Sequence, residues 1–120
     1  MPGLMGITER RVGDVTIVEL DGRLFLDEGE IPLRDHINQL VNDGRLKIVL
    51  DMGHVTRLDS AGIGMLASKY LTACRKGGSV KLLHVTPHSR YLLEITRLSS
   101  VLEIFESEDE VIRSFGVEPV

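Results

Sequence analysis

The chain has 120 residues, of which 42% are hydrophobic and 27% charged, values typical of one globular domain with a single core. Its formal net charge of −4 argues against a nucleic-acid partner, because such proteins normally present a basic surface. Cys74 is the only cysteine, which excludes an internal disulfide and indicates a reducing, cytoplasmic compartment. No stretch approaches the ~18 apolar residues that a membrane span requires.

The first half of the chain predicts a hairpin, a helix and a buried strand. Val15 begins an apolar strand, and Gly13-Asp14 before it suits a tight hairpin turn. Pro32 suits the first turn of a helix, and Gly44 suits its C-terminal cap. In chain order we expect strands over 7–11 and 15–20, a short strand over 23–26, a helix over 31–42, a strand over 47–51 and a loop over 52–58.

The second half alternates helices with strands. Thr86 suits the N-cap of a helix whose first residue is Pro87, and Ser107-x-x-Glu110 is a capping box. In the helix after Thr86, Leu92 and Ile95 are expected to face inward. We expect a helix over 60–76 with an inward stripe of Ile63, Leu66, Ala67, Tyr70 and Cys74, strands over 79–85 and 102–105, and a last helix after Ser107. Strands that lead and then alternate with helices predict an α/β fold, with a mixed β-sheet packed against about four helices.

The tetrad Asp59-Ser60-Ala61-Gly62 is the most informative motif, because a loop from a buried strand brings its serine to the start of an amphipathic helix. A hydroxyl at that position lies beside unpaired backbone N–H groups and the positive end of the helix dipole. The position suits a helix cap, and it suits a phosphate equally well. Function is expected to depend on which of these two roles Ser60 has.

Two enzyme motifs match the chain only in part. Gly62-x-Gly64-x-x-Ala67 has the glycine spacing of a dinucleotide-binding fingerprint, but several residues separate Asp51, the end of the strand, from the first glycine. A hydrolase elbow needs a glycine where Leu58 stands. Close packing of the backbone, or close approach of a partner, accounts for these glycines more simply.

The remaining ionisable residues do not group into a site. Asp51 resembles the phosphoacceptor of a receiver domain, but Glu19 and Asp21 match its magnesium-binding acidic pair poorly. The four histidines and the single cysteine have no metal-ligand spacing, and nothing places a histidine beside Ser60. The histidines, expected at the surface or at strand ends, are His36, His54, His84 and His88.

The motif from Asp59 to Gly64, the apolar strand before it and the Gly77-Gly78 pair after it resemble the STAS family, the domain of anti-sigma factor antagonists. The resemblance covers about residues 7–115, so a single STAS-like domain is expected over 1–120. Members of the family have a strand ending in Asp, a loop into Asp-Ser-(Ser/Ala/Thr)-Gly-(Leu/Ile)-Gly, and a helix.

This resemblance implies a partner switch in transcription regulation. The antagonist binds an anti-sigma factor with serine kinase activity and so releases the sigma factor; phosphorylation of the serine that matches Ser60 breaks the complex, and a metal-dependent serine phosphatase restores it. Ala61 replaces a second serine found in many members, which leaves one acceptor in the motif. Such a chain is not an enzyme, and it needs no cofactor or metal because the kinase brings ATP and magnesium. The regulated response, stress or sporulation for example, and the oligomeric state stay open.

The partner is expected to contact the start of the helix that follows Asp59. Met65 is expected to be exposed there, since a flexible thioether beside Gly64 has little structural purpose; packing under the preceding loop is the alternative. The expected contact residues are Asp59, Ser60, Ala61, Gly62, Gly64, Met65, Ser68 and Lys69. Two other functions stay open: a STAS scaffold or transport-complex subunit without a phosphorylation cycle, and a small-ligand-binding domain.

Overall fold

A computed structural model describes residues 6–24 and 30–119 of the chain. Within these ranges five strands form one sheet in the order β1-β2-β3-β4-β5, in which β1 pairs antiparallel with β2 and all other neighbours are parallel. The expected mixed-sheet α/β fold is therefore confirmed. The strands are β1 (Gly6–Val12), β2 (Val15–Leu24), β3 (Lys47–Leu58), β4 (Ser79–Leu83) and β5 (Ile104–Phe105); the helices are α1 (Glu30–Asn42), α2 (Ser60–Arg75), α3 (Pro87–Ile95) and α4 (Glu108–Ser114), with a 3-10 turn, η1 (Leu98–Ser100).

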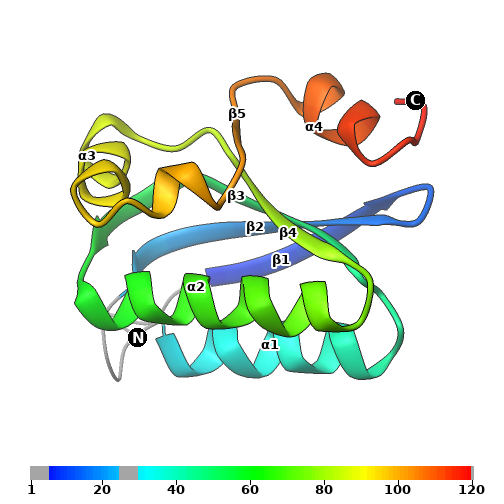
Figure 1. The fold of residues 1–120 in the computed structure, drawn as a ribbon, viewed down its shortest axis with the longest axis horizontal. Helices are drawn as coiled ribbons and strands as arrows, with labels where there is room; N and C mark the ends of the chain where they lie inside the picture. Colours follow the sequence, from blue (N-terminus) through cyan, green and yellow to red (C-terminus); the bar gives the residue numbers. More distant parts are fainter. Residues whose placement is uncertain (1–5, 25–29, 120) are drawn as a thin grey trace.

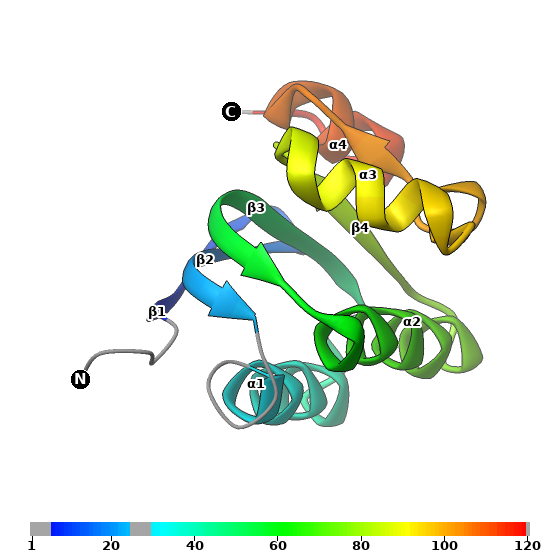
Figure 2. The same cartoon turned by 90° about the vertical axis from the view of Figure 1, so that its left-hand side faces the viewer.

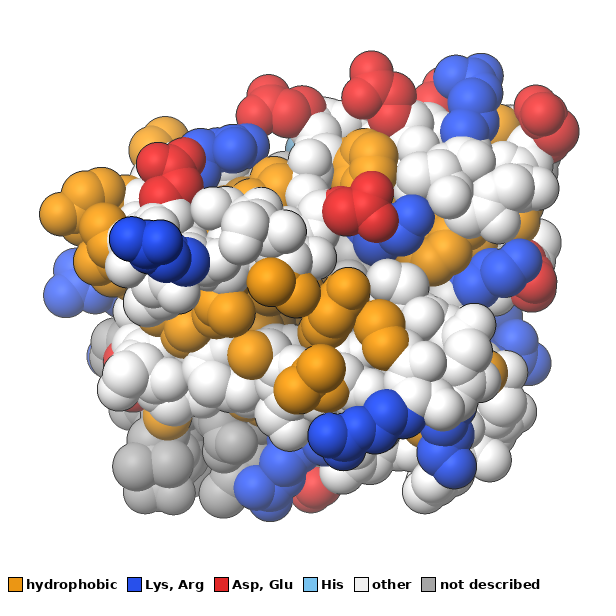
Figure 3. Space-filling model, viewed as in Figure 1, with side chains coloured by type: hydrophobic (Ala, Val, Ile, Leu, Met, Phe, Trp, Pro, Cys, Tyr) orange, Lys and Arg blue, Asp and Glu red, His pale blue; other side chains and the backbone are white. Residues whose placement is uncertain are grey.

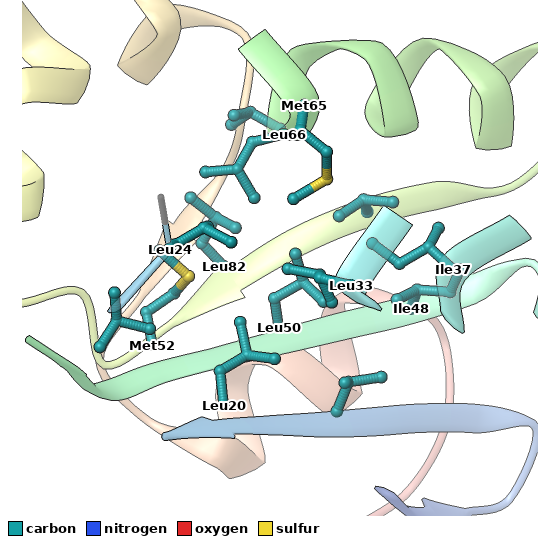
Figure 4. Close-up of a cluster of buried hydrophobic side chains, with 14 of the residues drawn as sticks. Leu20, Leu24, Leu33, Ile37, Ile48, Leu50, Met52, Met65, Leu66 and Leu82 are labelled. Atoms are coloured by element: carbon teal, nitrogen blue, oxygen red, sulfur yellow. The ribbon is translucent and has the colours of Figure 1, made fainter. Parts of the chain in front are cut away.

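The sheet separates two apolar clusters of unequal size. Helices α1 and α2 lie side by side under one face (Figures 1 and 2), and their Leu33 and Leu66 pack with Leu50 and Leu82 of the sheet in the main core (Figure 4). Helix α4 covers the other face with a smaller cluster, to which Val111 contributes. Since burying one leucine contributes roughly 1.5–3 kcal/mol, the α1–α2 side supplies most of the hydrophobic stabilisation.

Local signals in the sequence account for the turns and helix starts. Gly13, in the hairpin turn between β1 and β2, has φ of +59°, a conformation that glycine adopts without strain. Thr86 caps α3 by accepting a hydrogen bond from the backbone N–H of Ser89 (3.2 Å). Ser107 caps α4 by accepting one from the N–H of Glu110 (3.3 Å). The predicted hairpin turn and the predicted N-caps at Thr86 and Ser107 are confirmed.

The predicted loop over 52–58 is wrong, because this segment continues β3 up to Leu58. Its pairing with β2 is shifted at two places, as in β-bulges, so that the inward residues Met52, Val55 and Leu58 recur every third position. A strand normally alternates every second residue, so the bulges hid this extension from the pattern. The extension matters because it ends directly at Asp59.

Three smaller expectations also differ. Strand β4 ends at Leu83, and the next residue, His84, has φ of +56° as the chain turns away from the strand toward α3. Ile95 is 58% exposed, because α3 contacts the core through Leu93, which is fully buried. The short strand predicted over 23–26 continues β2 to Leu24, and its last two positions lie outside the described residues.

Candidate functional site

The tetrad lies where the β3 extension ends and α2 begins. The backbone N–H of Asp59 donates to the carbonyl of Leu24, the last residue of β2 (3.5 Å). The carbonyl of Asp59 then accepts the first helical hydrogen bond, from Ile63 (3.0 Å). The start of α2 is thus fixed to the ends of two neighbouring strands.

Asp59, and not Ser60, is the N-cap of α2. Asp59 has extended backbone angles, and its Oδ1 accepts a hydrogen bond from the N–H of Gly62 (2.9 Å). Ser60 is the first helical residue and is exposed. Within residues 6–24 and 30–119 its hydroxyl makes no hydrogen bond. The hydroxyl of Ser60 is therefore not used in holding the helix.

The two glycines of the motif have different surroundings. Gly62 is buried, and a Cβ added there would lie 2.5 Å from the carbonyl oxygen of Leu24 and 2.8 Å from Cδ1 of Leu58. Gly62 is therefore required for α2 to pack against the strand ends. Gly64 is exposed, and an added Cβ would meet nothing within 4 Å. Packing does not require a glycine at position 64.

The expected exposure of Met65 and Lys69 is wrong. Met65 is 4% exposed and lies in the main core beside Leu66 (Figure 4). Lys69 is 8% exposed, and its Nζ donates to Oδ1 of Asn38 on α1 (2.8 Å). The reason is that α2 packs against α1 as well as the sheet, which turns its inward face away from the predicted stripe. Cys74, predicted inside, is accordingly exposed.

The residues expected to contact a partner thus divide into two groups. Ser60, Gly64 and Ser68 are exposed, and Asp59 and Ala61 are half-buried. Gly62, Met65 and Lys69 are buried. Leu71, on the same helix, was not among the expected contact residues but is 48% exposed. The feature of the sequence that could have identified Leu71 is its spacing of three residues from Ser68 and from Cys74, which are both exposed.

Apart from the adjacent carboxylate of Asp59, the start of α2 has no acidic side chain. The first turn of α2 contains no acidic residue, and the helix as a whole contains no Asp or Glu. Its N-terminus carries the positive end of the helix dipole, which stabilises negative charge. A phosphate on Ser60 would therefore meet favourable backbone electrostatics from its own helix.

Two histidines lie beside carboxylates that do not belong to the tetrad. Nε2 of His36 is 2.9 Å from a carboxylate oxygen of Glu9, and Nδ1 of His84 is 3.2 Å from one of Asp51. An open cavity of about 330 Å³ is lined by Gly6, Thr8, Glu19, Leu20, Asp21 and His54, and by none of the tetrad. In the described part of the chain, no group of His, Cys, Asp or Glu side chains could hold a metal ion. No helix in the same ranges is long and apolar enough to cross a membrane.

Known proteins share both sequence and fold with this chain. A family model described as "Mlab, STAS domain" matches residues 7–103. An anti-sigma F factor antagonist from Paenibacillus polymyxa is 26% identical over 104 residues, which cover 86% of this chain and 88% of that protein. Two solved structures below 25% identity are similar in fold. A putative anti-sigma factor antagonist from Thermotoga maritima has a TM-score of 0.85 at 20% identity, covering 90% of this chain and 92% of that one. The phosphorylated form of the Bacillus cell fate determinant SpoIIAA has a TM-score of 0.70 at 18% identity, covering 91% and 99%.

Proposed function

The chain belongs to the STAS domain family, and from this premise we propose that it is an anti-sigma factor antagonist switched off by phosphorylation of Ser60. Its partner is an anti-sigma factor with serine kinase activity, which supplies ATP and magnesium, and a metal-dependent serine phosphatase reverses the modification. The protein itself binds and releases and does not catalyse. The similarity to the Paenibacillus polymyxa antagonist over most of both chains supports this role.

The observation that carries the proposal is that Asp59 and Ser60 have different roles at the start of α2. Asp59 caps α2, so the exposed hydroxyl of Ser60 is available to a kinase without loss of a structural hydrogen bond. Phosphorylation adds a charge of roughly −1.5 to −2 at a helix N-terminus, where the dipole favours it. The fold is therefore expected to persist after modification.

The complex with the anti-sigma factor, in contrast, is expected to dissociate when Ser60 is phosphorylated. A partner packed against Ser60 and Gly64 excludes water from the hydroxyl, and a phosphate there must lose its hydration or face like charge. Gly64 supports close packing, because its empty surroundings let a partner's surface approach the helix backbone. The exposed or half-buried contact residues are Asp59, Ser60, Ala61, Gly64 and Ser68.

Phosphorylation by the purified anti-sigma kinase from the source cell tests the proposal. Wild type and Ser99→Ala should be labelled to one phosphate each, whereas Ser60→Ala should bind the kinase and stay unlabelled. Ser99 is the matched control, because it is an exposed serine on η1, outside the proposed contact residues. Stoichiometric labelling of Ser60→Ala would move the acceptor, with Thr56 on the β3 extension as the next candidate.

A scaffold or transport-complex subunit is the second candidate, since a sulfate transporter family protein from Wolinella succinogenes has a similar fold, with a TM-score of 0.69 at 17% identity. Such a protein would use the same surface without a phosphorylation cycle. Affinity capture from the source cell separates the two functions. Recovery of a kinase-type anti-sigma factor supports the antagonist, and recovery of transporter subunits without a kinase supports the scaffold.

A further inference from the structure

An uncovered line of side chains runs along α2 from Ser60 toward the far end of the helix. Its members follow one another at intervals of four, three, four and three residues, which places them on one face of a helix. All are exposed except Ala67, which is half-buried. We name this set the α2 line; it consists of Ser60, Gly64, Ala67, Leu71 and Cys74. It is about 21 Å long at 1.5 Å per residue.

The α2 line is small near Ser60 and apolar farther on. Gly64 and Ala67 present almost no side chain, so another helix can approach to the 8–10 Å axis separation of packed helices. Leu71 is 48% exposed, although a leucine gains free energy when it is removed from water. Figure 3 shows hydrophobic side chains gathered over the middle of α2 on this face of the molecule. A helix face of small residues followed by a leucine suits close packing against a second helix.

Charge at the end of α2 indicates the chemistry of that second helix. The chain has a net charge of −4, yet α2 has no acidic residue and ends in Arg75 followed by Lys76. Neither of these basic side chains forms an ion pair within the described ranges. Carboxylates on an apolar helix that lies along the α2 line would complement them.

We infer that the α2 line is the docking face for one amphipathic helix of the anti-sigma factor, a helix that carries acidic residues where it passes Arg75. This inference rests on the proposed function and states how the partner binds. Phosphorylation at Ser60 then acts at one end of a continuous helix-to-helix contact. The contact extends to Cys74, at the other end of α2.

Alkylation of the single cysteine tests this docking face directly, since Cys74 is exposed at the far end of the line. With the purified anti-sigma kinase bound, the maleimide reaction rate of Cys74 should fall by about tenfold or more, as expected when complex dissociation limits access. The control is the double variant Cys74→Ser/Ile95→Cys, which moves the thiol to an exposed position on α3. Its reaction rate should not change on complex formation.

Affinity measurements give an independent readout. Leu71→Ser should weaken kinase binding by about tenfold, because it removes the largest apolar side chain of the α2 line from the contact, and Ile95→Ser should leave binding unchanged. Both side chains are largely exposed, so neither change should unfold the protein. An unprotected Cys74, or loss of binding in Ile95→Ser and not in Leu71→Ser, overturns the inference. If Ser60 is still phosphorylated in that case, the proposed function stands. A kinase that neither binds nor labels the wild type overturns both.

Discussion

The starts of α2 and α4 contain similar residues that do different things. In α4, Ser107 is the N-cap, and its hydroxyl accepts a hydrogen bond from the backbone of Glu110. In α2, Asp59 is the N-cap, and the serine follows one position later with a free hydroxyl. A serine at a helix start is thus structural in one case and available for modification in the other. The residue before it decides which.

The two helix starts also differ in charge. The first turn of α4 carries Glu108, Asp109 and Glu110, which complement the helix dipole permanently. The first turn of α2 carries no acidic side chain. The start of α2 has the carboxylate of its N-cap Asp59, and a phosphate on Ser60 would add further negative charge there, as the three acidic residues do in α4. This comparison explains why the modification should be tolerated by the fold.

Ser60→Asp should have the largest effect on binding. We expect it to weaken the complex with the anti-sigma kinase by at least ~1.4 kcal/mol, a tenfold change, because it introduces charge at the contact. The same change at the other helix start, Ser107→Asp, is the control and should leave binding unchanged, since aspartate also caps helices. Isothermal titration calorimetry measures both. Equal losses in the two variants would show that the effect is not local to α2.

Asp59→Ala should destabilise the protein by about 1 kcal/mol through loss of the α2 cap. Ser107→Ala should cost a similar amount for α4, whereas Ser60→Ala should stay within about 0.5 kcal/mol of wild type. Urea denaturation of the three variants measures the free energies of unfolding. A cost for Ser60→Ala as large as that for Asp59→Ala would mean that Ser60 holds the helix and is not free.

Gly64→Ala should stabilise the fold by up to about 1 kcal/mol, because a glycine inside a helix is unfavourable and its surroundings are empty. Affinity for the kinase should fall, because the partner's surface is proposed to approach the helix backbone at Gly64, so this one change separates stability from binding. Thermal denaturation and titration of the same sample give the two values. Destabilisation by alanine would show that position 64 has a packing role.

The smallest effect concerns pH and the start of α4. Nη1 of Arg10 on β1 donates to Glu108 (3.0 Å), and this hydrogen bond holds the pKa of Glu108 below its usual range. A pKa that is lower in the folded state adds stability at neutral pH, which is lost as the pH falls below about 4. Glu108→Gln should therefore cost less than about 1 kcal/mol at pH 7, and this cost should shrink as the pH falls below about 4. Asp109→Asn is the control, and an equal pH dependence in that variant would contradict the role of Arg10.

Features that depend on neighbouring residues in the chain could be predicted from the sequence. The turn at Gly13-Asp14 and the caps at Thr86 and Ser107 were predicted correctly, because each is set by residues within one turn. The position of the tetrad at the start of α2 was correct for the same reason.

Features that depend on distant contacts could not be predicted. The inward face of α2 is set by α1, through contacts such as that of Lys69 with Asn38, so Met65 was wrongly expected at the surface. The β3 extension pairs with β2 through two bulges, which removed the alternation expected of a strand. From the sequence, Ser60 suited both a helix cap and a phosphate acceptor. The hydrogen bond from the N–H of Gly62 to Oδ1 of Asp59 distinguishes these roles, because it makes Asp59 the cap.

The most direct test of the account compares the protein phosphorylated on Ser60 with the unmodified protein. Two quantities are measured on the same samples: the melting temperature and the dissociation constant for the anti-sigma kinase. We predict an unchanged or slightly higher melting temperature, since an anion at a helix N-terminus contributes about 0.3–1 kcal/mol, together with at least about tenfold weaker binding. A lower melting temperature with unchanged affinity would contradict the claim that Ser60 is a switch and not part of the fold.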